Sequence, residues 1–479
     1  MVQSGSQGKL GGRLQAYWRE WQAIGASPTV VEWLRNGFEI HLMRTVAGVT
    51  KKNKPPPRSA YISRIADAEK EWLLWFRERA KEEGIFARSP EEWPVRMGLF
   101  LRSKGPGREW RKQYRVVHDA RPVNWRMPQR TFKLPNPLDV AMAAGPKAMF
   151  IVIDFSDFFY QIPLHQESKK FTVVDMLGEK VHCEGLPMGL RLAPWVAQRI
   201  ANTLVNELRR RGVNCSMYLD DLICWAATKE LLLKQRDEII LPLVTLLGLR
   251  VAWEKGCLEP TQLIIYLGVI IDSVRSSFGL TEEKRTRILE KCLMTLRNGS
   301  ASPKILAAIA GTVNSTALAV HHARITAAKV WRSVGRPRCW TKRRSLSANS
   351  VKALQDVIQL FSAPHISRPW TQAKAVRVYV DASPTGFGGV AWGYNLPDIV
   401  GMWSEEEREL STTVRETRAA RRVLELAMTA WPQLCTGEWL LQIDATAAIS
   451  YVQRGTGMFT HLRWEVDQLY AAARRAGVV

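Results

Sequence analysis

The chain has 479 residues, of which 46% are hydrophobic and 24% charged, which excludes wholesale disorder and leaves room for several folded domains. Its formal net charge of +23 favours a polyanionic partner, and nucleic acid is the usual one. The seven scattered cysteines support neither a disulfide framework nor a zinc site, and no signal peptide or bilayer-spanning run is visible, so we expect a soluble intracellular protein.

The first 90 residues have a mainly helical pattern. Apolar residues recur at spacings of three and four over 14–25 and 28–42, which predicts two helices. A basic, proline-rich break follows at 51–59, and an amphipathic helix is expected over 60–84, ending at a glycine. We therefore interpret residues 1–90 as a helical N-terminal extension.

From about residue 95 the pattern changes to short apolar runs separated by helices. Strands are expected at 97–103, 113–119, 148–155 and 171–175, with a hairpin over 215–226 and helices over 194–212 and 229–250. Helices return over 281–299 and 302–335, a basic linker covers 335–347, and the strand–turn–strand pattern of 376–394 opens a separate α/β domain. The middle of the chain therefore predicts an α+β sheet domain followed by a helical segment.

Two adjacent acids, Asp220 and Asp221, interrupt the apolar run Met217–Trp225. A solvated hairpin tip would explain an isolated pair of this kind, because burying two unpaired carboxylates is costly. A functional explanation needs a third carboxylate nearby, and Asp154 follows the apolar strand Met149–Ile153. Asp157 could equally cap a turn. Two divalent cations about 4 Å apart could neutralise three such acids and act on a phosphate group.

The order and spacing of several motifs resemble those of reverse transcriptases. DFSDFFYQIPL, GLPMGLRLAP and YLDD are similar to that family's A, B and C motifs, YRVVHDARPVN resembles its fingers segment, and GLRVAWEKG and YLGVIID resemble motif D and the primer-gripping hairpin. The resemblance covers about residues 95–330. It implies a right-hand polymerase with fingers and palm over 91–275, a helical thumb over 276–335 and a basic connection over 336–375.

The resemblance also implies roles for single residues of the catalytic centre. Asp154, Asp220 and Asp221 would hold two Mg²⁺ ions, which Mn²⁺ could replace, with help from the backbone carbonyl of Phe155. Lys255 would act as the general acid that protonates pyrophosphate. The implied partners are an RNA or DNA template with its primer, dNTPs and RNA–DNA hybrid.

A second group of residues would bind the nucleotide or the template. Phe159 takes the steric-gate position that excludes a 2′-hydroxyl, and Arg115 would contact the triphosphate. Gly189 would cradle the template and incoming base, whereas Met188 departs from the glutamine usual in retroviral-type enzymes. For the basic fingertip, Arg102 and Lys104 are both candidates and stay open. The remaining matches to family motifs are Arg121, Asn124 and Pro194.

The C-terminal domain, residues 376–479, contains a second set of acids. Asp381 ends an apolar strand, Glu416 lies in an amphipathic helix and Asp444 follows another apolar run. Each alone is an ordinary cap or surface acid, but together they resemble the metal-binding acids of ribonuclease H. The family's fourth acid has no counterpart, since Asp467 does not match it, so we expect a C-terminally truncated domain of uncertain activity.

Three functional hypotheses follow from these observations. The first is an RNA- and DNA-directed DNA polymerase with a fused ribonuclease H, part of a retrotransposon and similar to tyrosine-recombinase (DIRS- and VIPER-like) elements, with Ty3-like, caulimovirus-like and hepadnavirus-like polymerases as competitors. The second is a decayed or co-opted element that only binds nucleic acid, and the third is a nuclease alone. Basic residues expected to contact duplex phosphates are Lys284, Arg285, Arg287, Lys291, Arg297, Lys342, Arg343 and Arg344.

Overall fold

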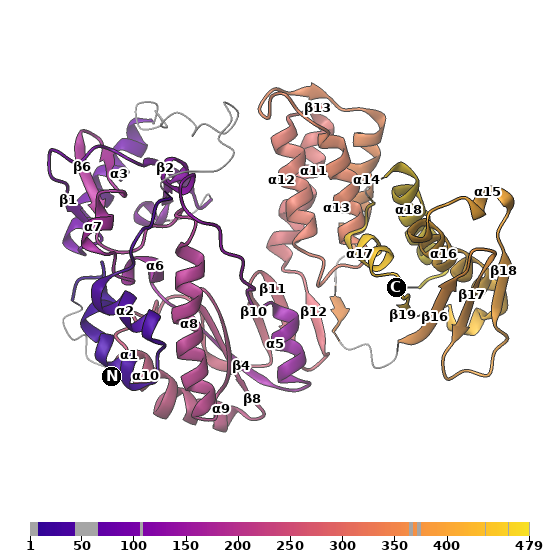
Figure 1. The fold of residues 1–479 in the computed structure, drawn as a ribbon, viewed down its shortest axis with the longest axis horizontal. Coiled ribbons are helices and arrows are strands. Elements are labelled where there is room, and N and C mark those ends of the chain that lie inside the picture. Colours follow the sequence, from indigo (N-terminus) through magenta and orange to yellow (C-terminus); the bar gives the residue numbers. More distant parts are fainter. Residues whose placement is uncertain are drawn as a thin grey trace. The chain divides into compact units, whose positions relative to one another are not determined.

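The computed structural model describes residues 8–43, 66–105, 109–363, 367–370, 375–435, 437–457 and 459–478. The chain divides into two compact units, one of residues 1–136 and 148–261 and the other of residues 137–147 and 262–479 (Figure 1). The predicted break at 51–59 lies outside the described residues. Among the described residues, no helix combines the length and apolar character needed to cross a bilayer.

The central sheet of the first unit has four antiparallel strands in the order β7-β8-β4-β9. Their bounds are Asn214–Tyr218, Asp221–Ala226, Met149–Asp154 and Cys257–Thr261. The interior of β4 is buried throughout, as expected of an uninterrupted apolar run. Helix α8 (Ala193–Arg210) packs its apolar face against β7, so the hairpin is held from one side by a long helix.

Smaller sheets and short helices complete the first unit. The strands are β2 (Gly98–Ser103) paired with β3 (Tyr114–Asp119), and β1 (Phe86–Arg88), β6 (Glu179–Cys183) and β5 (Val174–Met176) in a second sheet. The helices are α3 (Asp67–Glu82), α4 (Arg121–Asn124), α6 (Phe158–Gln161), α7 (Gln166–Lys169), α9 (Lys229–Gln235) and α10 (Leu241–Leu246), with a π-helical turn at Arg236–Ile240 between the last two.

The N-terminal segment is part of the core of this unit. A 3-10 turn at Arg13–Tyr17 leads into α1 (Trp18–Ala23) and α2 (Pro28–Asn36). The indole of the fully buried Trp21 donates a hydrogen bond of 3.0 Å to the carbonyl of Leu247. The N-terminal segment is therefore held in the first unit by contact with a residue far away in the sequence.

The helix predicted over 28–42 is wrong beyond Asn36. The backbone of Gly37 has a φ of 88°, and a Cβ there would lie 2.4 Å from the backbone nitrogen of His165. The N–H of Phe38 then donates to the carbonyl of Pro163 at 2.8 Å. The segment leaves the helix because its backbone pairs with a distant part of the chain, which periodicity does not report.

The second unit begins with another antiparallel sheet and a group of helices. The sheet has the order β10 (Leu263–Tyr266), β11 (Val269–Asp272), β12 (Ser277–Gly279) and β15 (Ser367–Pro369), and α5 (Pro137–Ala144) packs on β11. The helices are α11 (Glu282–Arg297), α12 (Pro303–Asn314), α13 (Ala323–Val334) and α14 (Ala348–Phe361), with a short pairing of β13 (Ser300–Ala301) and β14 (Arg344–Ser345). The pattern over 302–335 is thus two helices, broken where His322 has a φ of 61°.

The C-terminal domain is built on a mixed sheet with the order β18-β17-β16-β19. The strands are Ile399–Met402, Gly386–Ala391, Val376–Ala382 and Trp439–Gln442, and the helices are α15 (Glu405–Arg408), α16 (Thr412–Ala430), α17 (Thr446–Arg454) and α18 (Thr460–Arg475). Strands β16 and β19 are parallel, so their carboxyl ends meet at one edge of the sheet. Helix α16 packs against β16, β17 and β18.

Candidate active sites

The hairpin carrying the adjacent acids closes through a two-residue turn, Leu219-Asp220, with Tyr218 and Asp221 as the closing pair. Leu219 has a φ of 54°, in the left-handed region that favours glycine. A branched side chain there costs about 1–2 kcal/mol. The tip is therefore strained, and other contacts must hold it in place.

Two contacts hold this turn. On one side, the N–H of Phe155, at the end of β4, donates to the carbonyl of Asp220 at 3.0 Å. On the other, the side-chain amide of Gln198 on α8 accepts from the N–H of Leu219 at 3.0 Å and donates to the carbonyl of Met217 at 2.9 Å. The position of Asp220 is thus defined by both a strand and a helix.

Asp154 lies directly across the sheet from Asp221, because the two are Cα partners in the pairing of β4 with β8. The strand of Asp154 is thus paired with β8, the hairpin strand that begins at Asp221 directly after the Asp220 turn. Lys255 reaches the same place, with its Nζ 3.4 Å from Oδ1 of Asp154. Three acids and one lysine therefore lie together where β4 ends and β8 begins.

Burial and mutual repulsion perturb these acids. Burial raises the pKa of Asp220, as does the charge of Asp154, while Lys255 and Arg115 act in the opposite direction. Burial, then the charges of Asp220 and Asp154, raise the pKa of Asp221 to about 6. Half-buried carboxylates that raise each other's pKa are suited to a divalent cation, which favours their charged forms. The donor set, all carboxylate oxygen, suits Mg²⁺ or Mn²⁺.

The pairing of β2 with β3 aligns Arg115, which is expected to contact the triphosphate, with Arg102, one of the two candidates for the basic fingertip. Arg102 on β2 is the Cα partner of Arg115 on β3, and both side chains are exposed. Lys104 lies just beyond β2 and is also exposed. The pairing places Arg102 beside Arg115, whereas Lys104 lies nearer the end of the hairpin.

Asn124 ties the fingers-like segment to the loop that carries Gly189. Its amide nitrogen donates to the carbonyl of Gly189 at 2.8 Å, and its oxygen accepts from the N–H of Arg191 at 2.6 Å. Gly189 has a φ of 104°, and a Cβ there would lie 2.5 Å from the carbonyl oxygen of His118. Only glycine suits this close approach, and the neighbouring Met188 is half-buried.

A cavity of about 510 Å³ brings Arg102, Arg121, Asn124 and Gly189 together. Arg121 is already paired, because its guanidinium binds the carboxylate of Asp119 at 2.6 Å. Arg102 has a cation–π contact with the ring of Phe100, 5.8 Å from its centroid. Among the described residues Arg102 has no ion-pair partner, so of these two arginines it is the one that can bind a phosphate.

Two of the three phenylalanines of the DFSDFF motif, Phe155 and Phe159, differ in exposure. Phe155 is 1% exposed and lies in the core, so its ring is a packing element. Phe159, on α6, is partly buried and packs against the same core. Phe159 therefore keeps part of its ring surface accessible, as a steric gate requires.

The acids of the C-terminal domain converge. Within the described residues, Asp381, Glu416 and Asp444 form the one group of three whose ligand atoms all lie within 4.8 Å of one another. Asp381 is on β16, Asp444 follows β19, and Glu416 projects from the helix that covers the sheet. Parallel strand ends plus one helix thus form an acidic site from residues far apart in sequence.

Glu416 is the acid that most needs compensation. It is 3% exposed, and its Oε2 is buried without a hydrogen-bond partner. Burial, then the charges of Asp444 and Asp381, raise its pKa to about 7. An orphaned, buried carboxylate oxygen facing two further carboxylates fits a divalent cation.

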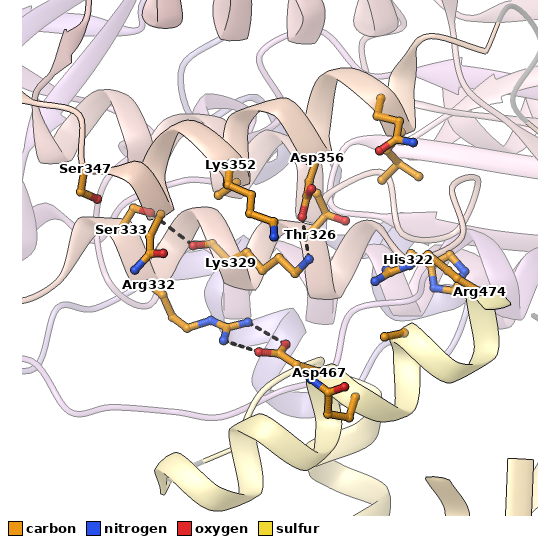
Figure 2. A pocket seen from close by; sticks show the side chains of 16 residues that line it. His322, Thr326, Lys329, Arg332, Ser333, Ser347, Lys352, Asp356, Asp467 and Arg474 are labelled. Carbon is orange, nitrogen blue, oxygen red and sulfur yellow. Dashed lines mark hydrogen bonds and ion pairs between the residues drawn. The ribbon is translucent and has the colours of Figure 1, made fainter. Parts of the chain in front are cut away.

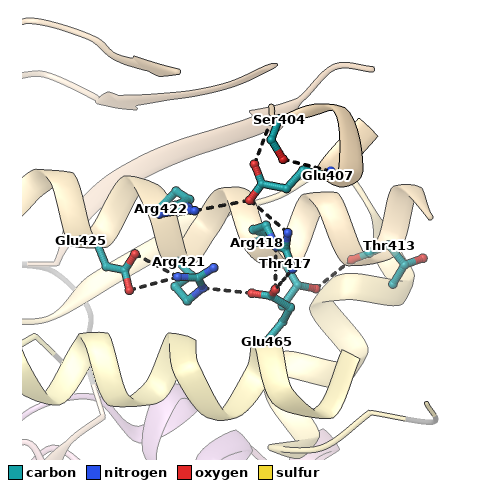
Figure 3. Close-up of polar contacts among 9 residues, drawn as sticks. All are labelled: Ser404, Glu407, Thr413, Thr417, Arg418, Arg421, Arg422, Glu425 and Glu465. Carbon is teal, nitrogen blue, oxygen red and sulfur yellow. Dashed lines mark hydrogen bonds and ion pairs between the residues drawn. The ribbon is translucent and has the colours of Figure 1, made fainter. Parts of the chain in front are cut away.

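A buried ion network anchors the helix that carries Glu416 (Figure 3). Glu465 on α18 is fully buried and accepts from Nε of Arg418 at 2.6 Å and from Nε of Arg421 at 2.9 Å. Arg418 also donates to Glu407 at 3.0 Å. With its charges paired, this network fixes α16 against α18 and is a structural element rather than a second acidic site.

Three of the predicted basic residues of the second unit line one groove, and a fourth is engaged elsewhere. Lys284, Arg287 and Lys291 line one groove on α11, together with Ile288 and Ile309. Arg285 does not belong there, because it binds the Glu282 carboxylate and donates to the carbonyl of Phe361 at 3.0 Å. Three of the residues predicted to contact duplex phosphates therefore share one groove.

A larger cavity of about 1010 Å³ lies between α13, α14 and α18 (Figure 2). Two of its four lysine and arginine side chains are paired, since Lys329 binds Asp356 at 2.6 Å and Arg332 binds both oxygens of Asp467. Asp467 is thus an ion-pair partner of α13, in agreement with its exclusion from the acidic site.

The sequence did not reveal the glutamines that position the first site. Gln198 and Gln161 are 3% and 0% exposed, and Gln161 bridges the Ser156 carbonyl, at 2.7 Å, to the Arg250 N–H, at 3.1 Å. The available signal was a polar side chain within an apolar helix face. Such a residue needs buried hydrogen-bond partners, but the pattern does not say which.

The comparison with protein families agrees with this geometry. Residues 103–271 match the family described as "Reverse transcriptase (RNA-dependent DNA polymerase)". A relative, the retrovirus-related Pol polyprotein from transposon opus of Drosophila melanogaster, is 26% identical over 190 residues, which cover 40% of this chain and 18% of the polyprotein. The Gag-Pro-Pol polyprotein of Human T-cell leukemia virus 2 is 27% identical over 225 residues, covering 40% and 15%. The matched stretch is a reverse transcriptase domain of the retrotransposon and retroviral Pol type.

Solved structures show how the whole chain is folded. The foamy viral protease-reverse transcriptase in complex with RNA/DNA hybrid has a TM-score of 0.55 at 15% identity, covering 99% of this chain and 63% of that one. The same type of protein in complex with dsDNA has a TM-score of 0.53 at 16% identity, covering 98% and 96%. The fold is therefore that of a right-hand polymerase followed by an α/β RNase H-like domain. The matches to the two polyproteins named above span less than a fifth of each.

Proposed function

We propose that this chain is an RNA- and DNA-directed DNA polymerase that adds dNTPs to a primer 3′ end as part of a retrotransposon's replication machinery. The observation that carries the proposal is the meeting of Asp154, Asp220 and Asp221 with Lys255 at one sheet edge, inside the matched reverse transcriptase domain. Its template would be RNA or DNA with an annealed primer. The net charge of +23 supports such a polyanionic partner.

The three carboxylates would hold two Mg²⁺ ions, with Mn²⁺ as a substitute. When bound, these ions supply activation of the primer hydroxyl and charge stabilisation at the phosphates. Lys255, already beside Asp154, would donate a proton to the pyrophosphate as it leaves. The backbone of Phe155, which binds the hairpin tip, would keep the strand end and tip in register.

The nucleotide would be bound by the paired fingers arginines. Arg102 and Arg115 lie side by side, so together they can contact the triphosphate, and this favours Arg102 over Lys104 as the fingertip cation. Gly189 and Met188 would support the template and incoming base. Phe159 would exclude a ribose 2′-hydroxyl by its bulk.

We propose a second activity, cleavage of the RNA strand of an RNA–DNA hybrid, for the C-terminal domain. The supporting observation is the convergence of Asp381, Glu416 and Asp444 within 4.8 Å. They would hold divalent metals that activate water. The buried, partnerless oxygen of Glu416 is the feature a merely structural acid would not have.

Primer extension on poly(rA)/oligo(dT) with Mg²⁺, run beside hybrid cleavage, tests both proposals and the alternatives. Extension together with cleavage supports the full proposal. Duplex binding without either activity would identify a decayed or co-opted binding protein, and cleavage without extension a nuclease alone. Extension that survives the double change Asp220→Asn and Asp221→Asn would also refute the polymerase assignment.

The gate assignment has its own test. Phe159→Ala should raise rNTP incorporation relative to dNTP incorporation roughly 10- to 100-fold, the equivalent of relieving a clash of a few kcal/mol. Single-nucleotide incorporation with matched dNTP and rNTP measures this ratio. Phe158→Ala is a useful comparison, because that ring is 1% exposed and should affect stability rather than sugar choice.

The lineage and the finer boundaries are further proposals. Residues 11–42 and 381–393 support a tyrosine-recombinase retrotransposon, which predicts a recombinase gene beside the coding locus. We propose fingers and palm over 91–275, a thumb over 276–335, a connection over 336–375 and the RNase H-like domain from 376. Seven cysteines without disulfide bonds support an intracellular site of action.

A further inference from the structure

The hairpin tip that presents Asp220 has an energetically unfavourable backbone. Leu219 precedes the acid with a φ of 54°, a conformation that side chains other than glycine rarely adopt. Left alone, such a turn would relax toward other conformations and carry Asp220 with it. Something must select the observed conformation.

The side chain of Gln198 makes that selection. Its Oε1 accepts from the N–H of Leu219 at 3.0 Å, and its Nε2 donates to the carbonyl of Met217 at 2.9 Å. The second hydrogen of Nε2 goes to Oδ1 of Asn202 at 2.8 Å. The amide orientation is fixed, because a flipped amide would point its nitrogen at the Leu219 N–H.

Gln198 occupies a position where packing alone would favour an apolar residue. It is 3% exposed and its buried neighbours on α8 include Val196, Ala197 and Ile200. Both of its contacts with the hairpin are to backbone atoms on either side of Tyr218. A side chain that only filled space would need neither a donor nor an acceptor here.

We propose that Gln198 is a positioning residue for the polymerase centre: it holds the strained Leu219 turn so that Asp220 faces Asp154 and Asp221 in one metal-binding arrangement. This inference rests on the proposed polymerase function. Gln198 touches neither substrate nor metal, so its effect must pass through the turn. Partners that orient metal ligands typically contribute 10- to 100-fold in metal affinity or activity.

The decisive variant is Gln198→Met, which keeps the length of the side chain and removes both hydrogen bonds to the hairpin. The matched control is Gln235→Met on α9. Gln235 is 9% exposed, and its amide donates to the carbonyl of Gly212 at 3.0 Å, just before β7. Both substitutions therefore remove a buried amide beside the same strand, at its two opposite ends.

Mn²⁺ binding to the full chain, without nucleic acid, is the first readout. All variants carry Asp381→Asn and Glu416→Gln, so that binding in the C-terminal domain does not contribute. Loss of the free Mn²⁺ electron-paramagnetic-resonance signal gives the affinity, and thermal unfolding confirms that each variant is folded. We expect Gln198→Met to weaken binding about 10- to 100-fold and Gln235→Met by less than about threefold. Equal losses in both variants, or no loss in Gln198→Met, would overturn the proposal.

Rescue at the turn is the second readout and does not depend on Gln198 packing. Glycine adopts positive φ freely, so Leu219→Gly should need no clamp. Adding Leu219→Gly to Gln198→Met is expected to restore at least about a third of the lost Mn²⁺ affinity on a logarithmic scale. If the double variant binds no better than Gln198→Met alone, the turn is not the route of the effect and the inference is wrong.

Primer extension separates this inference from the proposed function. In chains with the native C-terminal acids, Gln198→Met should lower kcat and raise the Mg²⁺ concentration needed for half-maximal rate, while KM for dNTP changes less than about threefold. A wild-type chain that binds Mn²⁺ but extends no primer would contradict the proposed function. The Mn²⁺ comparison would still decide the role of Gln198.

Discussion

The two acidic centres of this chain use the same chemistry on different supports. In the first unit Asp154 and Asp221 face each other on neighbouring strands, and Lys255 lies 3.4 Å from Asp154. In the C-terminal domain the buried Glu416 comes from a helix, and its ligand atoms lie within 4.8 Å of those of Asp381 and Asp444. Among the described residues the first trio does not meet that distance criterion.

The difference concerns where the compensating positive charge comes from. At the first centre the protein itself supplies part of the positive charge, since the charge of Lys255 lowers the pKa of both Asp220 and Asp221. At the second centre the charge of Arg415 lowers the pKa of Glu416, but that pKa is still raised to about 7. The second site is therefore more preorganised for a metal, and the first depends more on the turn and on Lys255.

Removing the hairpin acids should produce the largest loss of activity, and it tests whether the two acidic centres work independently. Asp220→Asn with Asp221→Asn is expected to lower primer extension by about 1000-fold or more, because the metal ligands act as a unit. Hybrid cleavage by the same preparation should stay within about twofold. A parallel loss of cleavage would mean that the two centres are not independent.

Glu416→Gln removes an acid of the second centre instead, and its effect can be measured both on hybrid cleavage and on the free energy of unfolding. Hybrid cleavage should fall about 100-fold or more while primer extension stays within about twofold. In EDTA the variant should be more stable than wild type at pH 8, by about 2–3 kcal/mol, because it removes a carboxylate that the fold disfavours.

The sign of that stability difference follows from the raised pKa. The folded chain prefers protonated Glu416, so wild type loses stability as pH rises from about 4.5 through about 7, whereas the variant does not. Urea unfolding across this range measures the difference. On the same helix, Glu425→Gln should be destabilising instead, because Glu425 is paired with Arg421 at 3.0 Å. A Glu416 variant that is less stable than wild type at pH 8 would argue against an uncompensated acid.

Lys255→Met removes the positive charge that the protein supplies to the first centre. Loss of the proton donor should slow primer extension roughly 100-fold. Because Lys255 lowers the pKa of Asp220 and Asp221, its removal raises both, and the acid limb of the pH–rate profile should move to higher pH. Lys234→Met, at an exposed lysine beside Glu238, should move neither rate nor profile. An unchanged profile in Lys255→Met would remove Lys255 from the electrostatics of the site.

Local pattern predicted most of the elements that carry these acids. The alternation around YLDD indicated the hairpin of β7 and β8, and the apolar run before Asp154 indicated β4. Their mutual pairing was only partly predictable, because strand order depends on contacts between segments far apart in sequence. The pattern did not say which strand of the hairpin lies beside β4, and the structure pairs β4 with β8, with Asp154 opposite Asp221.

The roles of residues that form hydrogen bonds with distant parts of the chain could not be predicted from the local sequence pattern. Gln198 is an ordinary polar residue in the sequence and Asn124 only a motif match, and their contacts emerge only when Leu219 and Gly189 lie beside them. The helix expected beyond Asn36 failed for the same reason, since Phe38 pairs with Pro163. Tertiary contacts override local propensity where a distant backbone offers a better partner.

The smallest effect is expected at a third acid, Glu184, whose negative charge is paired entirely with side chains of the protein. Glu184 accepts from Nζ of Lys169 at 2.6 Å and lies 3.1 Å from Nε2 of His182. The hydrogen bond with His182, then that with Lys169, lower the pKa of Glu184 to about 2. This carboxylate needs no metal, because its charge is paired within the fold.

Glu184→Gln should therefore cost about 1–3 kcal/mol of unfolding free energy at pH 7. Since the folded pKa is depressed, the carboxylate's contribution is present above about pH 4.5 and is lost as pH falls toward about 2. The difference between wild type and variant should shrink over that interval in urea unfolding, while a Glu230→Gln control at an exposed position shows no such change. A difference that persists at pH 2, or that grows on acidification, would show that Glu184 is not stabilised as a charged partner, and that compensation by protein cations is not what distinguishes it from Glu416.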